Sequence, residues 1–301
     1  MNIINSIYIL LAGIFWGSMG LFVHVLTDTF GFSSIQGAVL RITSCALILF
    51  VFLLVYNKKL LKISVRDIPI LALNGLISVL LMTVFYFSSI SSDTSMSISA
   101  VLLYTAPFIV MFLSCIFFKE KITFQKIVAL IIAFAGCCLV SLTEPGYSTP
   151  SGIILALLSA VAYALYSIFG SMALKRNLEP FTVTFYSFLF ASLGCIVIFF
   201  VTDMPKKISG VENLPVFALA VFATGLITAV LPFVLYTKGL SGTSPAKASI
   251  MAYIEPISAC VFGYFRGESM TALMILGICL TLASIVFLNI KIPHLSGKDK
   301  Q

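Results

Sequence analysis

The sequence predicts an all-α polytopic membrane protein in which ten transmembrane helices form two inverted five-helix repeats. Three observations support this prediction: an apolar composition, a charge difference between alternate loops, and an internal duplication. Of the 301 residues, 60% are hydrophobic and only 10% are charged, and the mean hydropathy is +1.13. Such a composition lies far outside the range of soluble domains. The chain therefore belongs in a lipid bilayer.

Ten apolar runs reach the length of about 20 residues that a helix needs to cross the hydrocarbon layer. The predicted spans are 5–26, 34–56, 68–90, 96–118, 124–142, 151–174, 180–201, 214–237, 245–265 and 270–290. The turn-like stretch "TEPGYSTPS" at 143–151 separates the fifth run from the sixth. We therefore divide the chain into a first repeat at 5–142, a second repeat at 151–290 and a cytoplasmic tail at 291–301.

Basic residues are distributed unequally between the two sets of loops. One set of loops, together with the tail, carries fourteen of the 18 Lys and Arg residues, the opposite set carries three, and Arg41 lies within a span. Because basic loops stay in the cytoplasm, this asymmetry predicts a cell-membrane protein with both termini cytoplasmic. It also accounts for the net charge of +7 without a nucleic-acid partner.

The two halves of the chain align with each other. "LAGIFWGSMGLF" from Leu11 aligns with "LSAVAYALYSIF" from Leu158, and "GLISVLLMTVFYF" from Gly75 aligns with "GLITAVLPFVLYT" from Gly225. The alignment pairs Trp16 with Tyr163, Tyr86 with Tyr236, Tyr104 with Tyr253, and Pro107 with Pro256. Since five is odd, the second unit enters the bilayer from the opposite side, an arrangement typical of secondary transporters.

At these residues the sequence resembles a known family. "FWGSMGLF", "LLYTAPFIVMFLSCIFFKEKIT" and "AYIEPISACVFGYFRGESMT" resemble the paired EamA domains of the drug/metabolite transporter superfamily, and the resemblance covers essentially the whole chain. It implies a ten-helix carrier, most often an exporter of small metabolites, amino acids among them. It also implies that spans 1, 3, 4, 6, 8 and 9 surround a central cavity, while spans 5 and 10 are peripheral and support a homodimer.

Glu255 and Pro256 lie side by side in the ninth span. Pro256 and its repeat partner Pro107 each remove a backbone donor, and in lipid the freed carbonyls must face protein or a watery cavity. Both positions are therefore predicted bends that flex during alternating access. A charge at the bilayer centre costs about 2.5–3.5 kcal/mol, so Glu255 should point inward and be paired or protonated. It is interpreted either as a coupling or substrate-binding group, or as a carboxyl that hydrogen-bonds the loosened backbone.

Aromatic residues at repeat-related positions form the predicted substrate-binding surface. Tyr and Trp combine a π face with a polar group and can hold an ammonium or an aromatic ring. The predicted set is Trp16, Tyr86, Tyr104, Tyr163, Tyr166, Tyr236 and Tyr253. The alternative is that these residues belong to the aromatic belts at the membrane interfaces.

Two further polar residues are candidates for coupling or gating. Arg41 lies inside the second span, where it is interpreted either as a structural residue, in an ion pair or in contact with helix-end carbonyls near the extracellular side, or as a gate or a site for a substrate carboxylate. His24, near the end of the first span, is a candidate for coupling, because histidine is the residue type best suited to exchange protons under physiological conditions. The spacing of Gly13, Gly17 and Gly20 predicts the close approach of another helix.

These features predict a secondary active transporter that moves a small organic metabolite, an amino acid or a related compound, outward in exchange for protons. The alternatives are an importer of a choline-like amine held in an aromatic cage and a translocator of a lipid-linked substrate. We expect no enzyme activity, no cofactor and no metal. The sequence shows no phosphate-binding glycine loop, no His and Cys cluster with metal spacing, and no catalytic triad signature.

Overall fold

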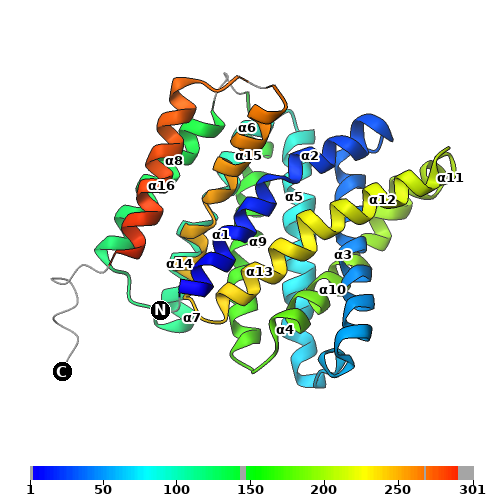
Figure 1. Cartoon of the computed structure of the whole chain (residues 1–301), viewed down its shortest axis with the longest axis horizontal. Helices are drawn as coiled ribbons and strands as arrows, with labels where there is room; N and C mark the ends of the chain where they lie inside the picture. The colour runs from blue at the N-terminus through cyan, green and yellow to red at the C-terminus, as the bar shows by residue number, and fades with distance from the viewer. Residues whose placement is uncertain (1–2, 143–146, 268, 291–301) are drawn as a thin grey trace.

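The computed structural model describes residues 3–142, 147–267 and 269–290. Within these residues, ten helical spans are long and apolar enough to cross a membrane, which confirms the predicted fold class. Several spans consist of two or three consecutive helical segments (Figure 1). The predicted tail at 291–301 and residues 143–146 of the linker lie outside the described residues.

The first five spans are built from consecutive segments of the chain. These segments are α1 (Ile3–Gly17), α2 (Met19–His24) and η1 (Val25–Thr29); α3 (Ser34–Tyr56); α4 (Ile68–Leu73), η4 (Asn74–Leu81) and α5 (Met82–Ser91); α6 (Met96–Leu103) and α7 (Ala106–Phe118); and α8 (Phe124–Ser141). Short 3-10 turns, η2 (Lys58–Leu61) and η3 (Val65–Asp67), connect α3 to α4.

The second five spans repeat this order. They are α9 (Pro150–Leu174); α10 (Pro180–Val201); α12 (Leu214–Gly225), η5 (Leu226–Val230) and α13 (Leu231–Leu240); α14 (Pro245–Met251) and α15 (Ile254–Phe265); and α16 (Ala272–Asn289). A short surface helix, α11 (Met204–Ser209), precedes α12.

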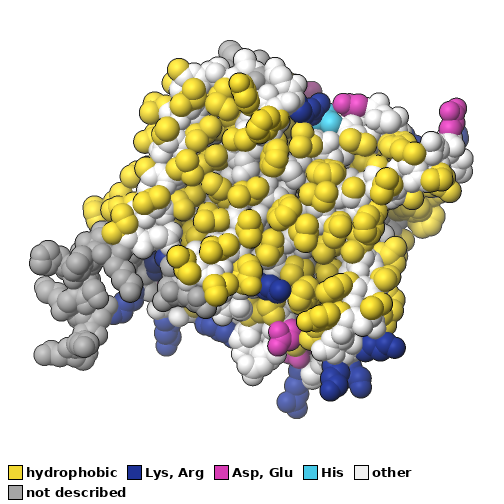
Figure 2. All heavy atoms as spheres, viewed as in Figure 1, with side chains coloured by type: hydrophobic (Ala, Val, Ile, Leu, Met, Phe, Trp, Pro, Cys, Tyr) yellow, Lys and Arg dark blue, Asp and Glu magenta, His cyan; other side chains and the backbone are white. Residues whose placement is uncertain are grey.

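Apolar side chains cover the middle of the molecule and charged side chains lie at its two ends. In Figure 2, Lys and Arg gather along the lower edge, while Asp, Glu and His side chains are visible at the upper edge. Large exposed residues such as Phe112, Ile131 and Leu276 lie on the outer surface. This distribution suits a protein whose girdle contacts acyl chains and whose ends contact water.

The fourth and ninth spans are interrupted at repeat-related positions. α6 ends at Leu103 and α7 begins at Ala106, and α14 ends at Met251 and α15 begins at Ile254. Because proline lacks an N–H, the regular helical bond to the carbonyl four residues earlier cannot form at either bend. Bonds to the carbonyl three residues earlier take its place, such as that from the Glu255 N–H to the Ala252 carbonyl at 2.9 Å. The Tyr253 hydroxyl donates to the Tyr104 carbonyl at 2.6 Å. The two bends therefore contact each other inside the helix bundle.

The third and eighth spans each contain a π-helical segment. These segments, η4 and η5, occupy the aligned "GLISVLL" and "GLITAVL" stretches. A π-helical segment widens the backbone and often marks a functional site. Nothing in the residue types of either stretch signals it.

Candidate functional site

A cavity of about 270 Å³ lies between the two repeats, and we call it the central cavity. Its walls come mainly from α2, η1, α3, α5 and α6 of the first repeat, and its deeper part includes residues of α9, α13 and α15. Of the residues predicted from the sequence, those that line it are Trp16, His24, Arg41, Tyr86, Tyr104, Tyr163 and Glu255. Residues far apart in the chain thus meet in one cavity.

The central cavity contains one acidic and one basic side chain deep in the bundle. Glu255, in the first turn of α15, accepts a long hydrogen bond of 3.5 Å from the Tyr104 hydroxyl. Arg41, on α3, is only 7% exposed, and its Nη1 donates to the Thr228 carbonyl of η5 at 3.3 Å. Within the part of the chain that the structure describes, no direct ion pair joins Arg41 to Glu255. Two opposite charges that line one cavity without pairing are each available to bind a charged group of a ligand.

Trp16 is the centre of an aromatic cluster at the cavity wall. Its ring lies 6.4 Å from that of its repeat partner Tyr163, 5.0 Å from Phe233 and 5.3 Å from Tyr236, measured between centroids. The edge-on and tilted geometries are those that aromatic pairs prefer. Gly13 and Gly17 of the same span pack directly on α15, whereas a β carbon added at Gly20 would meet nothing within 4 Å.

Three predicted residues lie behind the cavity wall. Tyr253 is 1% exposed and bonds the Tyr104 carbonyl. The hydroxyl of Tyr166 lies 3.1 Å from that of Thr237, and the hydroxyl of Tyr236 lies 2.7 Å from that of Ser167. These buried contacts satisfy the polar groups within the protein. They differ from the contacts of residues in an interfacial belt.

The layer formed by Tyr166, Ser167, Tyr236 and Thr237 separates the central cavity from the opposite face, and we call it the aromatic plug. Along α9, Tyr163 lines the cavity, Tyr166 belongs to the plug, and Ser171 lines a second hollow. Along α13 the order is the same, from Phe233 through Tyr236 to Leu240. The central cavity is therefore closed on this side.

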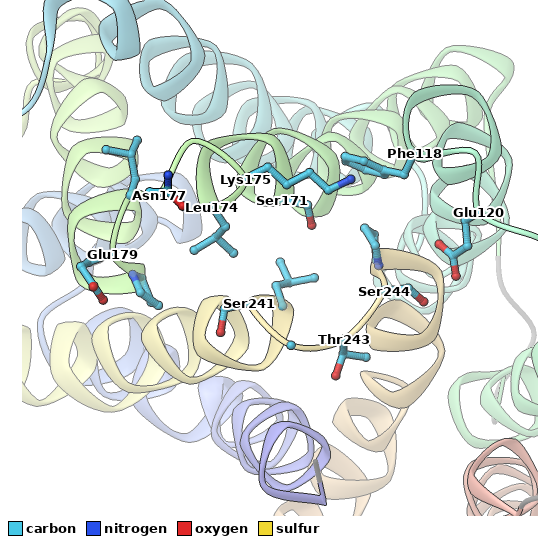
Figure 3. Close-up of a pocket in the computed structure, with 15 residues that line it drawn as sticks. Phe118, Glu120, Ser171, Leu174, Lys175, Asn177, Glu179, Ser241, Thr243 and Ser244 are labelled. Carbon is cyan, nitrogen blue, oxygen red and sulfur yellow. The ribbon is translucent and has the colours of Figure 1, made fainter. Parts of the chain in front are cut away.

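The second hollow, which we call the vestibule, has a volume of about 810 Å³. It lies between the end of α7, the α9–α10 turn and the α13–α14 loop (Figure 3). Its polar lining includes Glu120, Lys175 and Glu179. No sequence motif indicated this hollow, because its residues come from loops and helix ends of different spans.

The mouth of the central cavity carries a titratable pair. Nδ1 of His24 lies 3.2 Å from a carboxylate oxygen of Asp28, one helical turn further along the first span, and both side chains are more than half exposed. The remaining predicted residues, Pro107 and Pro256, are buried beside the two bends. Lining residues that the sequence did not single out include Met19, Thr27, Met82, Phe87, Met96 and Phe233. The repeat alignment gave no signal for them, since most are ordinary apolar residues.

The profile of the EamA-like transporter family matches residues 4–142 and 150–290. The chain belongs to this family. The two matched segments correspond to the two five-helix units of the fold. The protein is therefore a multi-pass membrane protein of a transporter family.

Relatives from archaea and bacteria support the assignment to this family. An uncharacterized transporter of Archaeoglobus fulgidus is 29% identical over 245 residues, which cover 79% of this chain and 82% of the relative. The uncharacterized transporter YdfC of Bacillus subtilis is 26% identical over 264 residues, covering 85% and 81%. A protein crystal structure matches with a TM-score of 0.75 at 15% identity, over 95% of this chain and 97% of the other. That last similarity concerns the fold alone.

Proposed function

We propose that this EamA-family protein is a secondary active transporter that exports a small zwitterion, an amino acid or a related compound, in exchange for protons. The observation that carries the proposal is the presence of Arg41 and Glu255 in one aromatic-walled cavity without a direct ion pair between them in the described part of the chain. Arg41 would bind the carboxylate of the cargo, because a guanidinium matches a carboxylate in shape and charge. Glu255 and the faces of Trp16 and Tyr163 would hold its ammonium.

The size of the cavity supports a small cargo. Sites for drug-sized ligands occupy about 300–1,000 Å³, so about 270 Å³ favours a compact metabolite over a lipid-linked sugar. The presence of Arg41 also disfavours a choline-like cation, which the guanidinium would repel. A cargo that carries both a carboxylate and an ammonium therefore suits the cavity better than either alternative.

The proposed exchange uses a single carboxylate for two cations. Glu255 would release a proton when the ammonium of the cargo binds and take up a proton when the cargo leaves. Occupancy by one cation excludes the other, so an inward proton movement can drive an outward cargo movement. The charge difference between the loops predicts that the mouth of the central cavity is extracellular, and with that orientation the proposed transporter would be in an outward-open state.

Counterflow into proteoliposomes tests this function. Purified protein is reconstituted with internal unlabelled amino acids, and uptake of the matching labelled compound is measured with and without an imposed pH gradient. We expect uptake of at least one amino acid above that of protein-free vesicles, with the rate set by the gradient. Choline and glycine betaine form a matched pair, because only the second carries a carboxylate. A broad panel without any exchange, or preferential exchange of choline, would contradict the proposal.

A further inference from the structure

The vestibule is the repeat-related counterpart of the mouth of the central cavity. The alignment that pairs Trp16 with Tyr163 also pairs His24 with Ser171 and Asp28 with Lys175. His24 lines the mouth of the central cavity, and Ser171 and Lys175 line the vestibule. The two hollows therefore mark the two ends of one route, with the aromatic plug between them.

Three buried polar atoms of the vestibule have no partner in the described part of the chain. They are Oγ of Ser171, Oγ1 of Thr243 and Oε2 of Glu120. Ser171 is only 6% exposed, and a buried hydroxyl without a hydrogen bond is costly to leave unsatisfied. These atoms come from three separate segments that border one hollow. Of the three, Ser171 lies nearest to Lys175 and Glu120 lies beyond Phe118 (Figure 3), so each is available to a different end of a bound ligand.

Charged groups of the vestibule also keep hydrogen-bonding capacity that contacts within the described residues do not fill. The Lys175 ammonium lies over the ring of Phe118, 4.1 Å from its centroid. In Figure 3 the Lys175 side chain runs above Ser171 toward Phe118, with Glu120 beyond Phe118 and Glu179 at the opposite end. One carboxylate oxygen of Glu120 accepts a 2.7 Å bond from Lys126, and the other is the oxygen without a partner among the described residues.

We propose that the vestibule is a second binding site for a small zwitterion, in which Lys175 and Ser171 hold its carboxylate while Glu120 holds its ammonium. This inference rests on the proposed function for the identity of the cargo class. The cationic and anionic groups of the ligand would each meet a charge-assisted partner, which makes both hydrogen bonds stronger than neutral ones. The site would hold cargo on the vestibule side of the plug until the plug opens.

Protection of an engineered thiol tests this site. In Figure 3 the Leu174 side chain points into the vestibule, so Leu174→Cys is introduced into the full-length protein after the seven native cysteines are replaced by alanine or serine. The rate of its modification by a small methanethiosulfonate is measured in detergent with each of the common amino acids. Propionate and ethylamine serve as analogues of alanine that carry one charge each.

At least one amino acid should slow the modification, and propionate and ethylamine should protect less than alanine does. Lys175→Gln removes one charge from an exposed position and should weaken the apparent affinity about tenfold or more. Glu120→Gln should weaken it as well. Glu255→Gln, in the central cavity, should leave the protection in place.

Three results would overturn the second site. The first is that no amino acid protects the thiol, and the second is that protection survives both Lys175→Gln and Glu120→Gln. The third is that protection disappears with Glu255→Gln, which would place the ligand in the central cavity. Failure of the two proposals can be told apart. Protection without counterflow would support the second site and contradict the proposed transport function. Counterflow without protection would support the transport function and contradict the second site.

Discussion

The sequence predicted that Glu255 faces the inside of the bundle, but it did not predict which residues surround it. A lone carboxylate in an apolar span had to face inward, because a charge in contact with lipid is costly. Its repeat partner is Ala106, so the alignment identified no second acid. The structure adds the Tyr104 hydroxyl at 3.5 Å and places Arg41 in the same cavity. Those neighbours come from other spans, and only the packing of helices reveals them.

Glu255→Gln should separate the charge of this residue from its shape. The amide keeps nearly the same volume but cannot carry the negative charge that binds an ammonium or exchanges a proton. A hydrogen bond to a charged group contributes about 1.5–3 kcal/mol, so gradient-driven counterflow should fall about tenfold or more. Tyr104→Phe, which removes only the long bond to Glu255, should have a smaller effect. Unchanged gradient-driven transport by the glutamine variant would exclude Glu255 from coupling.

At the scale of elements, the spans were more predictable than their interruptions. The length of the apolar runs predicted the ten spans, and Pro107 and Pro256 predicted the two bends. The π-helical segments η4 and η5 were missed, because their residues also suit a regular helix. Arg41 bonds the Thr228 carbonyl of η5, so one missed element supplies a contact of the candidate site. Backbone irregularity of this kind depends on neighbouring spans and is not encoded by local residue type.

The hydroxyl of Tyr253 crosses between the repeats and joins the two bends. Tyr253→Phe would deprive the Tyr104 carbonyl of its 2.6 Å donor in a buried position, where such a loss costs about 1–3 kcal/mol. The apparent melting temperature of the purified protein should therefore fall by several degrees. Tyr264→Phe removes an exposed hydroxyl of the same span and is the matched control. Equal melting temperatures for the two variants would show that the bends do not need this bond.

The contact between α1 and α15 can be tested with two glycines of one helical stripe. A β carbon at Gly17 would lie 2.7 Å from the Glu255 carbonyl and 2.5 Å from the Ser258 β carbon, whereas one at Gly20 would meet nothing within 4 Å. Overpacking of this kind costs about 1–3 kcal/mol. Gly17→Ala should lower the melting temperature and disturb transport, since α15 carries Glu255. Gly20→Ala should retain the melting temperature, and similar losses in both variants would contradict the close packing.

At the scale of the whole molecule, the proposed route has a hollow at each end and the plug between them, and the central cavity opens toward only one of these ends. The inverted arrangement of the repeats followed from the odd number of spans, and the profile match to both halves agrees with it. The side at which the route is open could not follow from the sequence. An outward-open and an inward-open arrangement of one bundle would share a single pattern of apolar residues and differ only in which contacts are made.

Thiol accessibility in intact cells should reveal both the orientation and the movement. Thr27 lines the mouth of the central cavity, whereas Ser167 is 4% exposed within the plug. On a background without native cysteines, Thr27→Cys should react quickly with a membrane-impermeant reagent added outside, because the charge difference between the loops predicts that this mouth is extracellular. Ser167→Cys should react slowly from either side at rest. In inside-out vesicles, where the reagent reaches the cytoplasmic side, this thiol should be modified faster while cargo is transported, since an alternating-access cycle must part the plug. A plug thiol that stays unreactive during measured transport would mean that the cargo takes a route other than the one between these cavities.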